Sequence, residues 1–204
     1  MTLDALITVI SVLGLGAFTI SGVIEAKRKE MDIVGAAAVA FITAVGGGTV
    51  RDVLLGRYPI FWVDDERYAI GIFALAAISF YSLRTTRIAS SAILIPDALG
   101  LGLFTVTGAS YALAAHASMA IASLMGVITG VFGGVLRDVI CNEIPAVFAR
   151  TQLYATCALV GAWTFLLLDR AGADAGIALT AGALATFLLR LAALRFDLRL
   201  QRPR

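Results

Sequence analysis

The chain has 204 residues, of which 60% are hydrophobic and 15% are charged, and its mean hydropathy is +0.93. A soluble domain of this size needs more polar surface than this composition supplies. The net charge of +2 comes from scattered residues rather than a basic stripe, so a nucleic-acid partner is not indicated. The composition therefore excludes a soluble globular protein and predicts an all-α polytopic membrane protein.

Seven apolar runs in the chain are long enough to be membrane-spanning helices. Their uniformly apolar character differs from the two-residue alternation of a membrane β-barrel, which excludes that class. The first run is followed, rather than preceded, by the basic cluster Lys27 to Lys29, so we expect a retained helix and not a signal peptide. The runs are 3–24, 33–55, 68–83, 88–113, 117–140, 151–168 and 175–194.

Basic residues are distributed unevenly over the loops between these runs. With seven spans the loops alternate between two sides, and the side of the N-terminus holds only three basic residues, Arg57, Arg67 and Arg170. The positive-inside rule therefore predicts an external N-terminus and a cytoplasmic C-terminus. The side of the C-terminus holds ten: Lys27, Arg28, Lys29, Arg84, Arg87, Arg150, Arg195, Arg199, Arg202 and Arg204.

The chain contains an internal repeat with an offset of 86 residues. Residues 13–22 (LGLGAFTISG) and 99–108 (LGLGLFTVTG) are identical at seven of ten positions, and the same offset aligns 47–53 (GGTVRDV) with 133–139 (GGVLRDV). Each copy holds three spans, an odd number, so the second copy must enter the membrane in the opposite direction. We expect two inverted three-helix repeats, 3–83 and 88–168, and a seventh helix at 175–195. Inverted repeats are typical of proteins that move solutes.

Glycines cluster in the second span of each repeat, as Gly46, Gly47 and Gly48 in the first copy and as Gly133 and Gly134 in the second. Glycine frees the backbone to bend or unwind, so matching glycine clusters predict interrupted helices beside a permeation path. The alternative is close helix packing, for which Gly126 and Gly130 have the appropriate spacing.

Each glycine cluster is followed by a charged pair, Arg51-Asp52 and Arg137-Asp138. Charges at or inside the membrane boundary need partners or water. They are interpreted either as clamps between helices or as groups that line or gate a wet cavity, and the two roles are compatible.

Asp97 is a fifth charge within an apolar run. If the fourth span begins near residue 88, Asp97 lies about 14 Å into the membrane at 1.5 Å per residue, and Pro96 is expected to kink the helix. An ionisable group at that depth is a functional-site candidate. If the span begins later, Asp97 is an ordinary interfacial residue.

The doubled pattern G-G-x-x-R-D, followed after six residues by Pro59 or Pro145, resembles the trimeric intracellular cation (TRIC) channels, specifically their prokaryotic members. Each copy is preceded by a G-x-x-x-F-x-x-x-G segment around Phe18 or Phe104. The resemblance covers about residues 3 to 195. Members of this bacterial group are also catalogued as glycine-transporter-like membrane proteins.

The resemblance implies a seven-helix protomer in a homotrimer of the prokaryotic plasma (inner) membrane, with an ion path inside each protomer. It implies passage of monovalent cations, chiefly K+, without a cofactor, and a pore shaped by broken second and fifth helices. Expected partners are K+ and membrane lipid. The residues carried over as pore or gating candidates are Gly46, Gly47, Gly48, Arg51, Asp52, Asp97, Gly133, Gly134, Arg137 and Asp138.

Two functions remain open from the sequence. The first is a K+-permeable cation channel, in which Arg51 and Arg137 must be neutralised because free guanidinium groups near the path would repel cations. The second is a secondary transporter of a small zwitterion such as glycine. An enzyme is not indicated, because the sequence contains no HExxH, GxSxG or P-loop motif. Cys141 and Cys157 are too isolated to predict a disulfide framework or a metal site.

Overall fold

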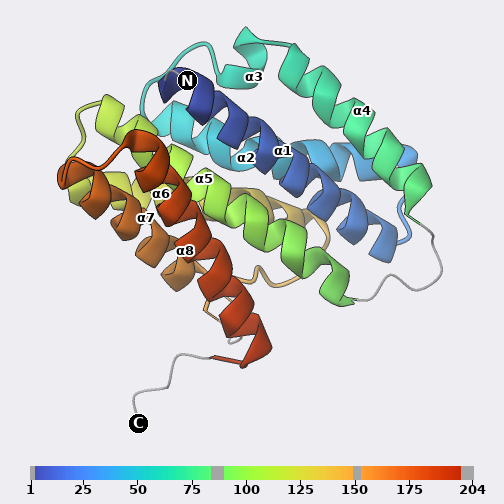
Figure 1. Ribbon diagram of the computed structural model, residues 1–204. Helices are drawn as coiled ribbons and strands as arrows, with labels where there is room; N and C mark the ends of the chain where they lie inside the picture. Colours follow the sequence, from blue (N-terminus) through green and yellow to red (C-terminus); the bar gives the residue numbers. More distant parts are fainter. Residues whose placement is uncertain (1–2, 84–89, 149–152, 199–204) are drawn as a thin grey trace.

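The computed structural model describes residues 3–83, 90–148 and 153–198, and every regular element in these ranges is helical. The all-α prediction is therefore confirmed (Figure 1). The elements are α1 (Leu3–Arg28), α2 (Ile33–Leu54), α3 (Phe61–Asp64), α4 (Arg67–Ser82), the 3-10 turn η1 (Ser90–Ile93), α5 (Leu94–Ala114), α6 (Met119–Ile140), α7 (Ala155–Arg170) and α8 (Ala175–Arg195).

Within the described residues, five helical segments are long and apolar enough to cross a membrane. They correspond to α1, α2, α5 with the preceding turn, α6 and α8, whereas α4 is a shorter apolar helix. The short helix α3 was not predicted, because four residues are too few to show a periodicity. The predicted starts of the fourth span at 88 and of the sixth at 151 lie outside the described residues, as do six of the basic residues used for the orientation.

The helices α2 and α6 each begin at a side chain that caps the helix, and the two capping residues occupy equivalent positions of the repeat. Asp32 accepts a hydrogen bond from the Gly35 amide at 2.8 Å and caps α2. Ser118, 86 residues later, accepts one from the Ile121 amide at 3.3 Å and caps α6. A side-chain oxygen at this position satisfies an amide that has no partner within the helix. The repeat is therefore visible in the helix boundaries as well as in the sequence.

The turns after the helices also correspond. Glu30 after α1 and His116 after α5 have φ values of 57° and 60°, and Gly56 after α2 and Asn142 after α6 have 64° and 55°. Both pairs are separated by 86 residues. A residue with positive φ is the usual end of an α-helix, because it lets the next amides bond back to the last carbonyls.

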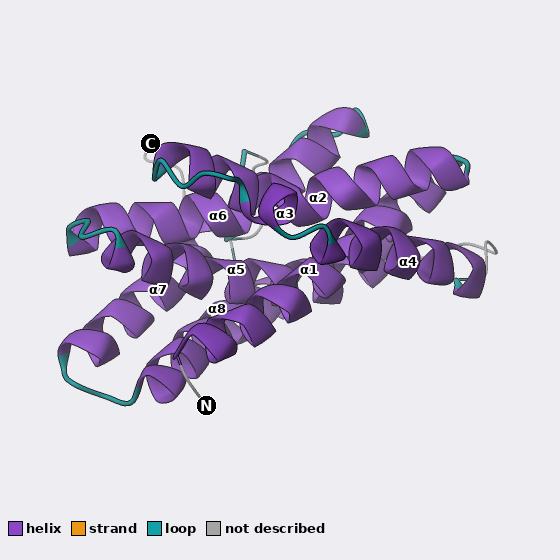
Figure 2. Cartoon of the chain, turned by 90° about the horizontal axis from the view of Figure 1, so that it is seen from above, coloured by secondary structure: helices purple, strands orange, loops and turns teal. Residues whose placement is uncertain are grey.

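The central helices are α1, α2, α5 and α6, with α5 in contact with α1, α6, α7 and α8. The helix α4 packs on α1 and α2 at one side, and α7 and α8 pack together on α5 at the other (Figures 1 and 2). The largest buried cluster, which includes Val106, Phe165 and Leu179, lies among α5, α7 and α8 and extends to α1 and α6.

Contacts between the two halves are reciprocal. The rings of Phe18 and Phe104, which are repeat equivalents, stack on each other with centroids 5.3 Å apart. A Cβ on Gly14 would meet the Phe104 ring, and a Cβ on Gly100 would meet the Phe18 ring. Each of these contacts from the first half to the second thus has a counterpart from the second half to the first. Such reciprocal contacts are the pattern of a two-fold interface.

The glycine clusters do not interrupt their helices. Both α2 and α6 run as single α-helices through Gly46 to Gly48 and through Gly133 and Gly134, so the predicted unwinding is wrong. The reason is packing. A Cβ on Gly47 would overlap the carbonyl oxygen of Thr129, and a Cβ on Gly133 would overlap that of Thr43. Glycine is required here for the close approach of α2 to α6 and keeps its helical conformation.

Candidate functional site

Arg51 and Asp52 form a buried ion pair at the end of α2. The Arg51 Nε donates to Asp52 Oδ1 at 2.8 Å, and Arg51 Nη2 lies at the same distance from that oxygen. The second carboxylate oxygen accepts from the Phe61 amide at 3.1 Å. The short helix α3 thus begins where its first amide binds Asp52. Both side chains are almost completely buried, so the pair satisfies the need for partners inside the membrane boundary.

The aromatic ring of Tyr111 extends this first cluster. The Arg51 guanidinium lies 4.2 Å from the ring centroid and the Arg57 guanidinium 3.9 Å from it. Two cations against one ring are stabilised by its quadrupole. The buried pair of Arg51 and Asp52 is neutral by itself, and Arg57, which is exposed, adds one positive charge beside it.

Arg137 forms the centre of a second buried cluster, at the end of α6. Its Nε donates to Asp138 Oδ1 at 2.9 Å and its Nη1 donates to Asp97 Oδ1 at 2.7 Å. The same Nη1 donates to Ser21 Oγ at 2.5 Å. Asp138 Oδ2 accepts from the Ala146 amide at 3.1 Å, which reproduces the contact of Asp52 with Phe61. Two carboxylates around one guanidinium give this cluster a formal charge of −1.

Both guanidinium groups are thus paired, as the sequence analysis required. The difference between the clusters arises at Asp97, because its repeat equivalent is Ser11. The second difference is at Tyr111, whose equivalent is Glu25.

The position of Asp97 differs from both alternatives drawn from the sequence. The helix α5 begins at Leu94, so Asp97 lies in its first turn and not nine residues into a helix. Pro96 also lies in this first turn, where amides have no partner within the helix, and it does not kink the span. Asp97 is nevertheless only 4% exposed, because it binds Arg137. It is therefore not an ordinary interfacial residue.

Two residues beside the second cluster were missed in the sequence. The Tyr154 hydroxyl is buried without a hydrogen-bond partner, and a Cβ on Gly134 would lie 3.1 Å from it and 3.5 Å from Asp97 Oδ1. The Arg190 guanidinium lies 4.7 Å from the Tyr154 ring centroid, and its Nη1 donates to the Leu153 carbonyl at 2.8 Å. A single arginine within an apolar run was the available signal for Arg190. Nothing in the local sequence marked Tyr154.

The two clusters lie on opposite sides of the glycine contact between α2 and α6. Gly47 faces Thr129 and Gly133 faces Thr43, so the helices are antiparallel there. Arg51 and Arg137 each lie four residues beyond these glycines, in opposite directions. At a rise of 1.5 Å per residue the two arginines are separated by about 18 Å along the helix axes. The arrangement is a tight central contact with a buried ionic cluster at each end.

Within the described residues, no group of three or more His, Cys, Asp or Glu side chains is placed to hold a metal ion. Cys141 and Cys157 are both buried and free. The candidate site therefore consists of ion pairs, hydroxyl groups and close-packed glycines.

A sequence model of the family described as glycine transporters matches the chain twice, over residues 8–84 and 94–170. Both bounds of the second match lie 86 residues after those of the first, which is the offset of the internal repeat. Two bacterial relatives are similar over nearly the whole chain. A UPF0126 membrane protein of Vibrio cholerae is 39% identical, over 96% of this chain and 82% of that protein. The UPF0126 inner membrane protein YadS of Escherichia coli is 37% identical, over 94% of this chain and 93% of that protein.

Solved structures with the same fold are channels. The TRIC trimeric intracellular cation channel orthologue from Rhodobacter sphaeroides has a TM-score of 0.88 and 43% identity, over 94% of this chain and 98% of that chain. A prokaryotic TRIC channel in 0.5 M KCl has a TM-score of 0.87 and 32% identity, over 97% of this chain and 100% of that chain. From these similarities in sequence and fold, together with the doubled motif, we conclude that this membrane protein belongs to the family of TRIC channels.

Proposed function

We propose that this protein is a passive, K+-permeable channel for monovalent cations, with one ion path inside each protomer. The path runs between α2 and α6, through the level of their glycine contact and past the two ionic clusters. Its pore and gating residues are Gly46, Gly47, Gly48, Arg51, Asp52, Asp97, Gly133, Gly134, Arg137 and Asp138.

The observation that carries this proposal is the formal charge of −1 on the buried cluster of Asp97, Arg137 and Asp138. A buried negative charge beside a narrow path raises the local concentration of cations and repels anions. The buried pair of Arg51 and Asp52 has no net charge, so we assign the cation preference to the end of the path that contains Asp97.

The glycine contact supports a gating role for α2 and α6. At Gly47 and Gly133 there is no room even for a methyl group between the helices. Ions can pass at this level only if α2 and α6 separate or tilt. At the two ends of this contact Asp52 links α2 to α3, and Arg137 links α6 to α5 and α1. Movement of α2 or α6 should therefore be linked to rearrangement of these contacts.

The proposed architecture is seven membrane-spanning helices, as inverted repeats 3–83 and 88–168 with a seventh helix at 175–195. The reciprocal contacts of Phe18 with Phe104 and of the glycines support the inverted relation. The trimeric description of the Rhodobacter sphaeroides channel supports a homotrimer. The basic loops support an external N-terminus and a cytoplasmic C-terminus, in a bacterial inner membrane as for YadS.

The test is planar-bilayer recording of the purified protein in a KCl gradient, with the Asp97→Asn variant beside the wild type. We expect unitary currents that reverse near the K+ potential in the wild type, and a reversal potential closer to zero in the variant. Asp169→Asn is the control, because Asp169 is exposed at the end of α7 and outside both clusters. A chloride-selective wild type, or equal shifts in both variants, would contradict the proposal.

The second candidate, a transporter of a small zwitterion such as glycine, is favoured by the description of the matching family model. Buried guanidinium and carboxylate groups also offer partners for both charges of an amino acid. No K+ current, with saturable uptake of glycine into liposomes, would establish this alternative.

A further inference from the structure

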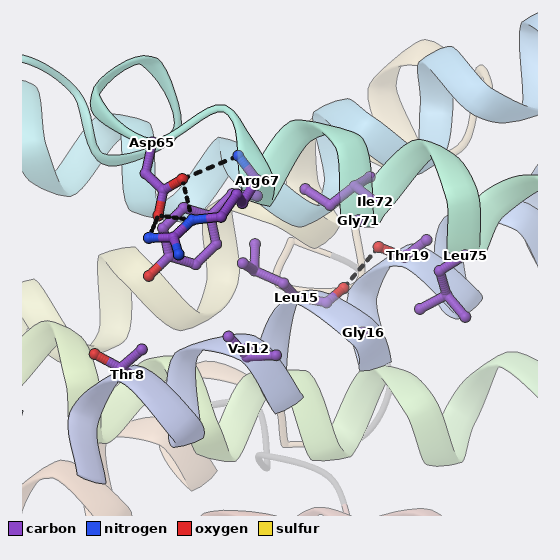
Figure 3. A pocket seen from close by; sticks show the side chains of 11 residues that line it. Thr8, Val12, Leu15, Gly16, Thr19, Asp65, Arg67, Gly71, Ile72 and Leu75 are labelled. Atoms are coloured by element: carbon purple, nitrogen blue, oxygen red, sulfur yellow. Dashed lines mark hydrogen bonds and ion pairs between the residues drawn. The ribbon is translucent and has the colours of Figure 1, made fainter. Parts of the chain in front are cut away.

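A groove with a volume of about 510 Å³ runs between α1 and α4, apart from the two ionic clusters (Figure 3). Its wall on α1 extends from Thr8 to Thr19. That distance is about 16 Å at 1.5 Å per residue, which is close to half of a hydrocarbon core about 30 Å thick. Since α1 is apolar and long enough to cross a membrane, the groove has the length of one lipid leaflet.

The groove is left open by two glycines on its walls, Gly16 on α1 and Gly71 on α4. A Cβ on Gly71 would have no heavy atom within 4 Å, and a Cβ on Gly16 would meet only Leu75 Cδ2, at 3.7 Å. Gly47 and Gly133, by contrast, are needed for helix contact. Close packing of the helices therefore does not explain Gly16 and Gly71. The absence of side chains at these two positions leaves the groove open.

One end of the groove is charged, whereas the rest of its lining is largely apolar. Asp65 and Arg67 form a two-pronged ion pair at the start of α4, with Arg67 Nε and Nη2 at 2.8 Å and 2.7 Å from the carboxylate oxygens (Figure 3). The Arg67 side chain is 86% exposed, so its remaining donors are accessible. Hydrogen bonds from Arg67 hold the pKa of Asp65 below its ordinary value, and the carboxylate stays ionised at neutral pH.

We infer that the groove binds one acyl chain of a zwitterionic phospholipid, with the phosphate on Arg67 and the headgroup ammonium near Asp65. The occupant follows from the order of the lining: an ion pair at the mouth, where α4 begins, then an apolar channel toward the middle of α1. Guanidinium groups bind phosphate well, and a carboxylate oxygen that already binds Arg67 has a second lone pair with which it can accept from an ammonium group.

The ion pair also determines which lipid is preferred. Asp65 and Arg67 together have no net charge, so they give no net electrostatic preference for an anionic over a zwitterionic headgroup. An ammonium donor, which phosphatidylethanolamine has and phosphatidylglycerol lacks, is needed to engage Asp65. This inference depends only on the membrane location of the chain and is independent of ion conduction.

The test is native mass spectrometry of the full-length protein released from nanodiscs that contain equal amounts of phosphatidylethanolamine and phosphatidylglycerol. We expect one phosphatidylethanolamine retained per protomer in the wild type. Gly71→Leu adds a side chain to the groove where a Cβ meets no atom within 4 Å, and should reduce retention about tenfold. Arg67→Ala should remove the preference between headgroups. Ala74→Leu, a similar enlargement of an exposed α4 residue outside the groove, is the matched control and should behave as the wild type.

Three outcomes would overturn the inference. The first is undiminished lipid retention in Gly71→Leu. The second is equal retention of both lipids by the wild type. The third is a loss of oligomer mass in Gly71→Leu with lipid retention unchanged, which would show that a second copy of the chain covers the groove.

Discussion

Arg51 and Arg137 occupy equivalent positions in the repeat but neutralise different numbers of carboxylates. Arg137 binds Asp97 and Asp138, whereas Arg51 binds Asp52 alone. Removal of one partner of a buried ion pair costs about 3–5 kcal/mol, because the remaining charge stays buried without compensation. Arg137→Ala leaves two such charges close together. We therefore expect it to lower the free energy of unfolding by at least that amount, and by more than Arg51→Ala does.

Thermal unfolding of Arg51→Ala and Arg137→Ala in the same detergent measures which variant is less stable. The double change Arg137→Ala with Asp97→Asn should recover part of the lost stability, since it removes one uncompensated carboxylate. Equal unfolding midpoints for Arg51→Ala and Arg137→Ala would contradict the assignment of Asp97 to the Arg137 cluster.

Lys29 and Glu143 form an ion pair between the loops that follow α1 and α6. The hydrogen bond from Lys29 lowers the pKa of Glu143 below its ordinary value. A carboxylate with a lowered pKa in the folded protein stabilises it above the ordinary Glu pKa of about 4.3, and this contribution disappears as the pH falls through the lowered pKa. Glu143→Gln should therefore be slightly less stable than the wild type at pH 7, and the difference should disappear as the pH falls below the lowered pKa.

The unfolding midpoint against pH for both proteins tests this prediction. Lys29→Met is the matched control and should show the same loss at pH 7. A difference between Glu143→Gln and wild type that persists below the lowered pKa would show that Glu143 contributes by something other than this ion pair.

At the scale of the helix, the close contact at Gly47 and Gly133 and the helix propensity of alanine predict opposite effects of a glycine-to-alanine change on stability. Alanine at Gly47 or Gly133 would favour an isolated helix by about 1 kcal/mol. Its Cβ would, however, overlap a backbone carbonyl of the facing helix, and overpacking costs about 1–3 kcal/mol or more. We expect Gly47→Ala and Gly133→Ala to be destabilising, and Gly71→Ala, which meets no atom, to be neutral or stabilising. Unfolding midpoints in detergent measure all three, and a stabilised Gly47→Ala would contradict the close contact of α2 with α6.

The helices were predictable from the sequence because hydropathy is a local property of each segment. The repeat was predictable because its two copies can be compared directly with each other. Whether the glycines of α2 and α6 unwind these helices or let them pack closely could not be predicted. A row of glycines permits both unwinding and close approach, and only the facing carbonyls of Thr43 and Thr129 decide between them. Asp97 lies in the first turn of α5 because a 3-10 turn, η1, precedes that helix, and hydropathy does not distinguish such a turn from an α-helix. Tyr154 reaches the second cluster through tertiary contacts that no spacing in the sequence encodes.

At the scale of the whole molecule, the two halves share their geometry but differ in their charge. Asp52 and Asp138 each accept from an amide of the segment that follows their helix, yet Arg57 in one half corresponds to Glu143 in the other. The result is a neutral buried pair at one end of the α2 and α6 pair and a negative cluster at the other. The repeated scaffold therefore has an asymmetric charge, which the proposed ion path would use between two different solutions.

The inverted relation of the halves and the orientation of the chain can be tested together. Glu30 and His116 are exposed repeat equivalents in the turns after α1 and α5. If the repeats are inverted and the N-terminus is external, His116 faces the outside and Glu30 the cytoplasm. In a background with Cys141→Ala and Cys157→Ala, an impermeant maleimide should label His116→Cys in intact cells and Glu30→Cys only after permeabilisation. Labelling of both variants from one side would refute the inverted repeat, whereas exchanged sides would keep the repeat and reverse the orientation.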